Sequence, residues 1–226
     1  RQHQANGWEI NESRLRQQAW ALNDRIMFEA SNTINTSSSS AAGAGAGGGG
    51  NRNTVDPLAG SGCITFNGND EYVSAPNAQV VNWLPGTGDF TVEWFMKQTD
   101  TPSHPRVFSL GVDTGATLGC SIESGTCYIW PYGGDLSGDM PDGFINTWVH
   151  IAVCRSGTTT KLFIDGVLKS TVTGDSRSID DSINPGRDLY MGNDSSTPLV
   201  NAWPGRLTNF RWDNSAIYTD TFVVPT

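Results

Sequence analysis

The stretch from Trp148 to Thr173 constrains the fold of this chain more than any other. Its first segment, 148–155, is apolar on both faces, which is typical of a strand covered on both sides. Two turn sequences follow, Ser156-Gly157 and Asp165-Gly166. Asp-Gly between alternating apolar residues is a strong hairpin signal, because a type I′ turn needs a positive φ at both central residues. The stretch therefore predicts three consecutive antiparallel strands, a β-meander.

The whole region from Asp56 onward has the same character. Short strand-like runs are separated by Gly, Pro, Asn and Asp in every gap, and no helical period interleaves them. Such a pattern is typical of an all-β, two-sheet antiparallel sandwich. The expected strands cover 62–67, 72–75, 89–97, 106–112, 118–123, 126–130, 148–155, 161–164, 167–172, 188–192 and 205–212. We expect five tryptophans to pack in the core or at sheet edges: Trp83, Trp94, Trp148, Trp203 and Trp212.

Four segments of this region carry a family resemblance. In chain order they read CITFNGNDEYV from Cys63, DFTVEWFMK from Asp89, WVHIA with LFIDG in the meander, and the closing LYMGN, WPGRLTNFRW and AIYTDTF from Leu189. Together they resemble laminin-G-like domains of the concanavalin-A-like jelly-roll superfamily. The resemblance implies a jelly-roll over residues 56–226. Its closing segments most resemble laminin-G-like domains in virion proteins of bacteriophages.

The N-terminal part has a different character, which predicts a division into three regions. Residues 7–30 predict one α-helix with Asn11 as N-cap, and its apolar stripe contains Trp8, Leu15, Leu22 and Ile26. Residues 31–55 are rich in Ser, Ala and Gly and predict a flexible linker. We therefore expect a helical anchor at 1–30, a linker at 31–55 and the β domain at 56–226. A helix packed on its own β domain is the alternative to an anchor that self-associates.

Charge and hydropathy exclude some classes of partner. The formal net charge is −9, whereas binding to a phosphate backbone needs clustered Lys and Arg, so we expect no nucleic-acid partner. The sequence has no apolar run long enough to span a bilayer, so we expect no membrane insertion. Charged residues make up 16% of the chain, and this low share favours an extracellular or particle-borne β protein over a cytosolic enzyme.

The four cysteines do not form a metal motif. Their spacing contains no C-x-x-C and no Cys/His cluster, which argues against structural zinc. Cys120 and Cys127 flank a six-residue segment that could form a hairpin, so a disulfide between them is one prediction and two free thiols the other. Cys63 and Cys154 lie inside apolar strands, where buried free thiols are expected.

The sequence offers little that resembles catalytic machinery, so we expect a protein that is not an enzyme. Its three histidines are scattered, and His150 in the central strand is expected to be a hydrogen-bonded structural residue. Retaining glycosidases need two carboxylates about 5–5.5 Å apart. The jelly-roll glucanase pattern Glu-x-Asp-x-x-Glu is absent, and Glu93 is a lone acid on its strand.

The best candidate for binding is the glycine-rich loop 130–143. Trp130 and Tyr132 would stack on sugar rings, and Asp135 and Asp139 would hydrogen-bond sugar hydroxyls. Calcium prefers several oxygen ligands at about 2.3–2.6 Å, which Asp135, Asp139 and Asp142 could supply. The sequence requires no cofactor. Calcium is the cofactor that these carboxylates would bind. An ordinary acidic, solvated loop is the alternative reading of the same residues.

These observations favour a non-catalytic structural or binding protein. The resemblance implies a virion component, such as an appendage, fibre or capsid-decoration protein, whose lectin-like head contacts glycans of the host surface. The N-terminal helix would then bind other copies of the chain or other virion proteins. The alternatives are a secreted or cell-surface carbohydrate-binding adhesion module, a structural filament subunit and a glycoside hydrolase. The expected location is the virion or the extracellular space.

Overall fold

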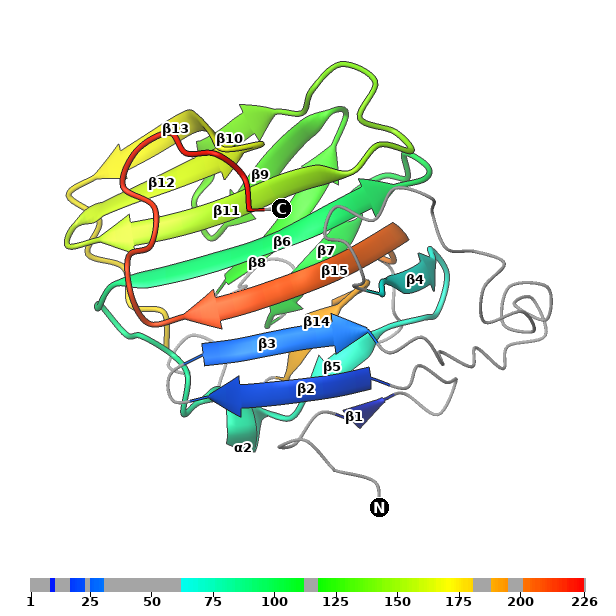
Figure 1. The fold of residues 1–226 in the computed structure, drawn as a ribbon, viewed down its shortest axis with the longest axis horizontal. Coiled ribbons are helices and arrows are strands. Elements are labelled where there is room, and N and C mark those ends of the chain that lie inside the picture. The colour runs from blue at the N-terminus through cyan, green and yellow to red at the C-terminus, as the bar shows by residue number, and fades with distance from the viewer. Residues whose placement is uncertain are drawn as a thin grey trace.

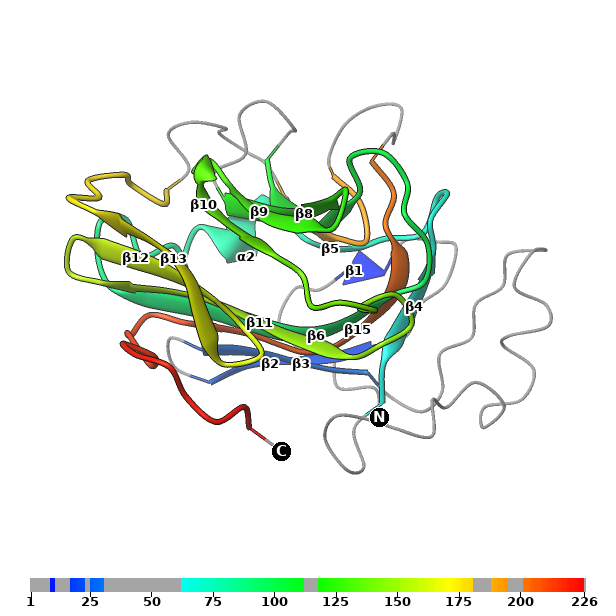
Figure 2. The same ribbon diagram turned by 90° about the horizontal axis from the view of Figure 1, so that it is seen from above.

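The computed structural model describes residues 9–10, 17–22, 25–30, 62–111, 118–180, 188–194 and 201–225. These residues form two antiparallel β-sheets stacked face to face, seen from the front in Figure 1 and along their edges in Figure 2. One short helix, α2 (Asn77–Val80), follows the strand β5. The all-β sandwich that the sequence predicts is confirmed. Among the described residues, no helix has the length and apolar character needed to span a bilayer.

The seven-stranded sheet, which we call sheet A, has the order β1-β5-β14-β7-β8-β9-β10. Its strands are β1 (Glu9–Ile10), β5 (Val73–Ala75), β14 (Leu189–Met191), β7 (Arg106–Leu110), β8 (Leu118–Glu123), β9 (Thr126–Trp130) and β10 (Gly133–Asp139). Sequence-distant β5, β14 and β7 therefore lie side by side, which brings the polar residues after β14 next to the start of β7.

The eight-stranded sheet, which we call sheet B, has the order β13-β12-β11-β6-β15-β3-β2, and β4 also pairs with β15. Its strands are β2 (Gln17–Leu22), β3 (Arg25–Ala30), β4 (Ile64–Asn67), β6 (Phe90–Gln98), β11 (Val149–Ser156), β12 (Thr159–Ile164), β13 (Val167–Thr173) and β15 (Pro204–Asp213). The meander β11-β12-β13 is the one predicted from the sequence. Its second turn has φ 49° at Asp165 and 74° at Gly166, as a type I′ turn requires.

The predicted N-terminal helix over residues 7–30 stays a prediction, because the structure describes only parts of that segment. Residues 17–22 and 25–30 form the hairpin β2-β3, and β3 pairs with β15 through Phe28↔Phe210 and Ile26↔Trp212. Their apolar residues form two short continuous runs, 19–22 and 26–28, and periodicity alone does not distinguish a strand from a helix in such runs. Trp8, Leu15 and the linker 31–55 lie outside the described residues, and the assembly role of this segment stays a prediction.

The core lies between the two sheets and consists mainly of aromatic and branched side chains. Trp94 of β6 meets Phe108 of β7 edge-on, with ring centroids 5.0 Å apart, and stacks against Phe210 of β15. Trp203 and Trp212 are also fully buried, and Trp83 nearly so. Burial of each such side chain stabilises the fold by about 1.5–3 kcal/mol. Trp148, the fifth predicted core tryptophan, is only half-buried.

The C-terminal segment 214–225 covers part of the outer face of sheet B (Figure 2). The backbone N–H of Ile217 donates to Thr91 Oγ1, and that of Phe222 donates to the carbonyl of Gly166 at 3.0 Å. Phe222 packs on Phe163, with ring centroids 5.4 Å apart. Because this segment covers it, the central part of sheet B is buried on both faces, as the unbroken apolar run 148–155 predicts.

Candidate functional site

The segment predicted as a binding loop is largely a strand. β10 forms one edge of sheet A and pairs with β9, with a register shift between Gly133 and Ser137. Leu136 is buried in the core and anchors the strand. The sequence Gly-Gly-Asp-Leu-Ser-Gly-Asp has no β-branched or aromatic residue, so propensity gave no strand signal. Asp135 and Asp139 are therefore held on an edge strand, not on a loop.

Trp130 ends β9 and points away from the core, as the alternating burial of β9 shows. Its indole Nε1–H donates to Ser121 Oγ at 3.1 Å, and the Arg106 guanidinium lies over the ring, 5.3 Å from its centroid. These two contacts fix the orientation of the ring, which remains partly exposed. The structure thus holds an ordered aromatic surface at the outer side of sheet A.

A buried polar network supports Trp130 from below. Ser121 Oγ donates to Glu123 Oε1 at 2.7 Å, and Arg106 Nη1 lies 3.5 Å from the same oxygen. Burial lowers the pKa of Arg106, whereas the charges of Glu123 and Asp194 act in the opposite direction. An arginine remains protonated in proteins, so this side chain places a permanent positive charge against one face of the indole. Arg106 and Glu123 were not predicted from the sequence. For Glu123 the available signal was the alternation of Gly119, Ser121 and Glu123 with apolar residues along β8.

Tyr132, the second predicted aromatic, is not at the surface. Its side chain is 3% exposed, and its hydroxyl donates to Asp175 Oδ2 at 2.8 Å. Burial and the hydrogen bond with Asp175 raise the pKa of Tyr132 to about 12. Thr160 Oγ1 donates to the same carboxylate oxygen at 2.6 Å. Tyr132 therefore ties β10 to sheet B instead of presenting a ring to a ligand.

The three carboxylates predicted for calcium are not gathered. Asp135 is exposed and lies 4.0 Å from Arg177 Nη2, whereas Asp139 accepts a hydrogen bond from Thr126 Oγ1. Asp142 lies in the exposed turn after β10. Among the described residues, no group of three His, Cys, Asp or Glu side chains is arranged to hold a metal ion. The observed positions thus do not provide the shared calcium site that the sequence suggested.

A second polar cluster lies on the outer face of sheet B, beneath the C-terminal segment. Glu93 Oε1 is 2.5 Å from Arg211 Nη2, and its Oε2 is 3.2 Å from His150 Nε2. Burial favours a raised pKa for Glu93, but the hydrogen bond with His150, the charge of Arg211 and the hydrogen bond from Tyr218 outweigh it and lower the pKa. The prediction that His150 is a hydrogen-bonded structural residue is confirmed. Glu93 is an ionised carboxylate with its oxygens occupied, which does not suit a general acid.

Cys120 and Cys127 lie next to each other as free thiols, with their sulfur atoms 3.7 Å apart. The predicted hairpin forms, but its register places Cys120 opposite Ile129 and Ile122 opposite Cys127. The two cysteines are diagonal neighbours, for which Cα atoms are typically about 7–8 Å apart, beyond the usual span of a disulfide. Cys154 is a buried free thiol as predicted, and Cys63 is half-buried.

The polar residues after β14 are also buried. Asn193 and Asp194 are both 0% exposed, and Asn201 Nδ2 donates to Asp194 Oδ2 at 2.5 Å. By sequence alone, residues 193–196 are a polar loop. In the structure this segment instead fixes the start of β7, because the N–H of Arg106 donates to the carbonyl of Asn201.

The two-sheet antiparallel arrangement defines a β-sandwich protein, with a partly exposed tryptophan on the outer face of one sheet. Residues 67–220 match the model of the concanavalin A-like lectin/glucanases superfamily, and the chain belongs to this family. The family resemblance in the sequence is thereby confirmed at the level of the superfamily. No curated protein sequence matches the chain.

Several solved structures share the fold at low sequence identity. Domain 4 of AbnA, an extracellular arabinanase from Geobacillus stearothermophilus solved with arabinotriose, has a TM-score of 0.52 and 17% identity, covering 73% of this chain and 75% of that chain. The binding domain of botulinum neurotoxin serotype D has a TM-score of 0.52 and 13% identity, covering 70% and 40%. Trypanosoma rangeli sialidase has a TM-score of 0.51 and 17% identity; the match covers 68% of this chain but only 25% of the sialidase.

Proposed function

We propose that this chain is a non-catalytic, glycan-binding head of lectin type, and that Trp130 is its principal contact with the sugar. The observation that carries the proposal is the indole, which is partly exposed on sheet A and held in place by Ser121 and Arg106. An aromatic face that is already oriented binds a ligand at a lower entropic cost than a mobile one. The fold similarity to an arabinanase domain solved with arabinotriose supports the same class of ligand.

The proposal that the chain is not an enzyme rests on its buried carboxylates. Glu93 is bound by Arg211, Asp175 accepts hydrogen bonds from Tyr132 and Thr160, and both carboxyl pKa values are lowered despite burial. Glycoside hydrolysis needs a carboxyl group that is protonated near neutral pH, beside a second carboxylate. Burial raises the pKa of Glu71, but its Oε2 accepts the backbone N–H of Asn67 at 2.7 Å and so closes the turn before β5.

A glycan array tests this function. We expect the full chain to bind a restricted set of glycans, Trp130→Ala to lose that binding, and Trp130→Phe to keep part of it. Val223→Ala is the control, because this side chain is 92% exposed and lies in the C-terminal segment, which covers sheet B and not sheet A. Equal binding by the wild type and Trp130→Ala, at equal thermal stability, would refute the role of Trp130. Release of reducing sugar from any bound glycan would refute the non-catalytic assignment.

We propose that this head belongs to a virion appendage, fibre or capsid-decoration protein. The alternative is a secreted or cell-surface adhesion module, which absence of the chain from purified virions would favour. The resemblance of the closing segments to phage virion proteins supports the first setting. Residues 1–30 would then bind other copies or other virion proteins. Light scattering of the full chain beside a chain that begins at Val55 tests this role: we expect an oligomer to become a monomer. The same number of subunits in both chains would refute the assembly role of the N-terminal segment.

A further inference from the structure

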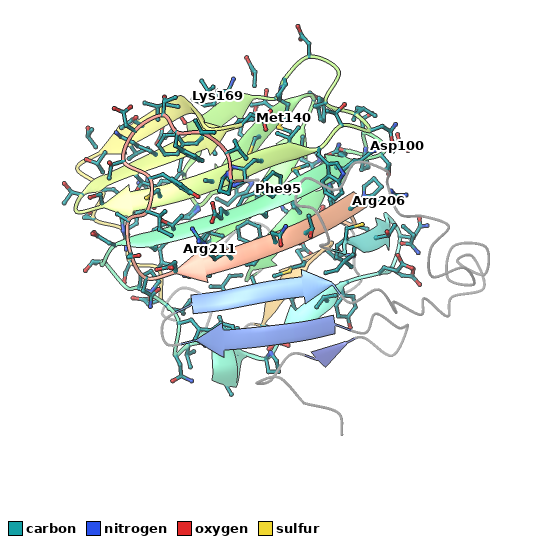
Figure 3. The ribbon with its side chains drawn as sticks, in the orientation of Figure 1. Phe95, Asp100, Met140, Lys169, Arg206 and Arg211 are labelled. Atoms are coloured by element: carbon teal, nitrogen blue, oxygen red, sulfur yellow. The ribbon has the colours of Figure 1, made fainter. Side chains whose placement is uncertain are left out.

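Two cations face each other on the outer face of sheet B, and no described acid forms an ion pair with either. Arg206 of β15 pairs directly with Lys97 of β6 in the strand register. Burial lowers the pKa of Lys97, and the charge of Arg206 lowers it further, whereas the nearby Cys63 thiol acts in the opposite direction. Figure 3 shows Arg206 at the β4 end of β15, apart from Arg211 of the Glu93 cluster and with Phe95 between them. The two positive charges thus lie close enough to repel each other.

Two buried hydrogen-bond donors on these neighbouring strands have no acceptor among the described residues. They are the Nε–H of Arg206 and the indole Nε1–H of Trp148. Trp148 directly precedes Val149, which pairs with Met96, so it stands beside Lys97 on the adjacent strand. A buried donor without an acceptor has lost its hydrogen bonds to water and gained none in return, so an acceptor that reached these two groups would stabilise the fold.

The other arginines whose side chains the structure describes have a carboxylate or carbonyl partner, although Arg211, like Arg206, also has a buried Nε–H without an acceptor among the described residues. Arg106 and Arg211 bind Glu123 and Glu93, Arg177 binds Asp175, and Arg155 donates to three backbone carbonyls. The chain carries a formal net charge of −9, so its acidic residues outnumber its basic ones. No ion pair joins any described acid to Arg206 or Lys97. Like charges directly opposite each other on neighbouring strands destabilise a sheet, and a counter-ion removes that cost.

From this arrangement we infer that Arg206, Lys97 and Trp148 form an oxyanion-binding site, which takes a carboxylate, sulfate or phosphate group. Arg206 and Lys97 donate charged hydrogen bonds to the anion, and the indole of Trp148 donates a neutral one. Charge-assisted hydrogen bonds of this kind are the strong ones in proteins. The site lies on sheet B, whereas Trp130 lies on sheet A, so it does not depend on the proposed sugar contact. An acidic sugar and a free inorganic anion are two sources of the same group.

The test uses the full chain, labelled with ¹⁵N in Arg and Trp, and follows the Nε–H signals of Arg206 and Trp148 by NMR. Sodium sulfate is titrated at constant ionic strength against sodium chloride, and methyl glucuronide is titrated against methyl glucoside. Arg206→Gln and Lys97→Gln remove one charge each from the site. Lys169→Gln is the control, because it removes the same charge from the exposed strand β13.

We expect saturable shifts of both signals with sulfate, with glucuronide or with both, and none with glucoside. Saturation by sulfate indicates a site for free oxyanions, and saturation by glucuronide alone indicates an acidic sugar. Either site variant should raise the dissociation constant about 10- to 100-fold, as expected for the loss of one charge-assisted hydrogen bond, while Lys169→Gln leaves it unchanged. Shifts that never saturate, or that are equal in the site and control variants, would overturn the inference. Loss of Trp130-dependent sugar binding would not affect it.

Discussion

Glu93→Gln is expected to destabilise the fold strongly, because it leaves Arg211 without its counter-charge while keeping the size of the side chain. Removing one partner of a buried ion pair costs about 3–5 kcal/mol. The Glu93 side chain is 8% exposed and that of Arg211 is 23% exposed, so water can partly solvate the remaining cation. We therefore expect a loss of about 2–3 kcal/mol in the free energy of unfolding, or about 5–10 °C in Tm for a chain of this size.

The assay is urea denaturation followed by tryptophan fluorescence, at several pH values. The folded-state pKa of Glu93 lies below the ordinary value of a glutamate, so its stabilisation is complete above that ordinary value and is lost as the pH falls through the lowered pKa. The difference between wild type and Glu93→Gln should therefore shrink in acid. Asp135→Asn, whose side chain is 76% exposed, should cost less than about 0.5 kcal/mol. A loss below about 1 kcal/mol for Glu93→Gln, or a difference that grows in acid, would refute the reasoning.

Three further predictions follow from burial. Phe222→Ala should cost about 1.5–3 kcal/mol in urea denaturation, because the half-buried ring packs on Phe163 and holds the C-terminal segment, whereas Val223→Ala, at 92% exposure, should cost nothing measurable. Asn193 begins an N-x-S sequon but is fully buried, so mass spectrometry after expression in a glycosylating host should find it unmodified; an occupied Asn193 would contradict the position of β14. Cys120 and Cys127 should react as two free thiols with a thiol reagent only after denaturation, and a mass 2 Da lower than that of the reduced chain would instead show a disulfide.

The meander was predictable from the sequence because its signals are local. Asp165-Gly166 specifies its turn, and the apolar run 148–155 specifies a strand that is covered on both faces. Burial of His150 followed from the same run. The sandwich followed from many short strands without helical periodicity, and the family from segments in the same order as in known relatives.

The site was less predictable, because its parts come together through sheet order. Strand β10 has a glycine-rich sequence and forms because it pairs with β9 and because Leu136 is buried. Propensity scales include neither of these tertiary effects. Trp130 was identified as an aromatic in a polar segment, but Arg106, which lies over its ring, is 24 positions away in the chain (130 − 106). The approach of the two positive residues Arg206 and Lys97 likewise depends on the pairing of β15 with β6.

The central claim is that Trp130 is the residue on which a sugar binds, and ¹⁵N-indole NMR of the full chain tests it most directly. The chain has 8 tryptophans, and Trp130→Phe assigns the signal of interest by removing it. A glycan selected on the array is then titrated into the wild-type protein. We predict a saturable shift of the Trp130 indole signal, with the signals of the buried Trp94 and Trp203 unchanged. A glycan that binds with the Trp130 signal unmoved would contradict the account.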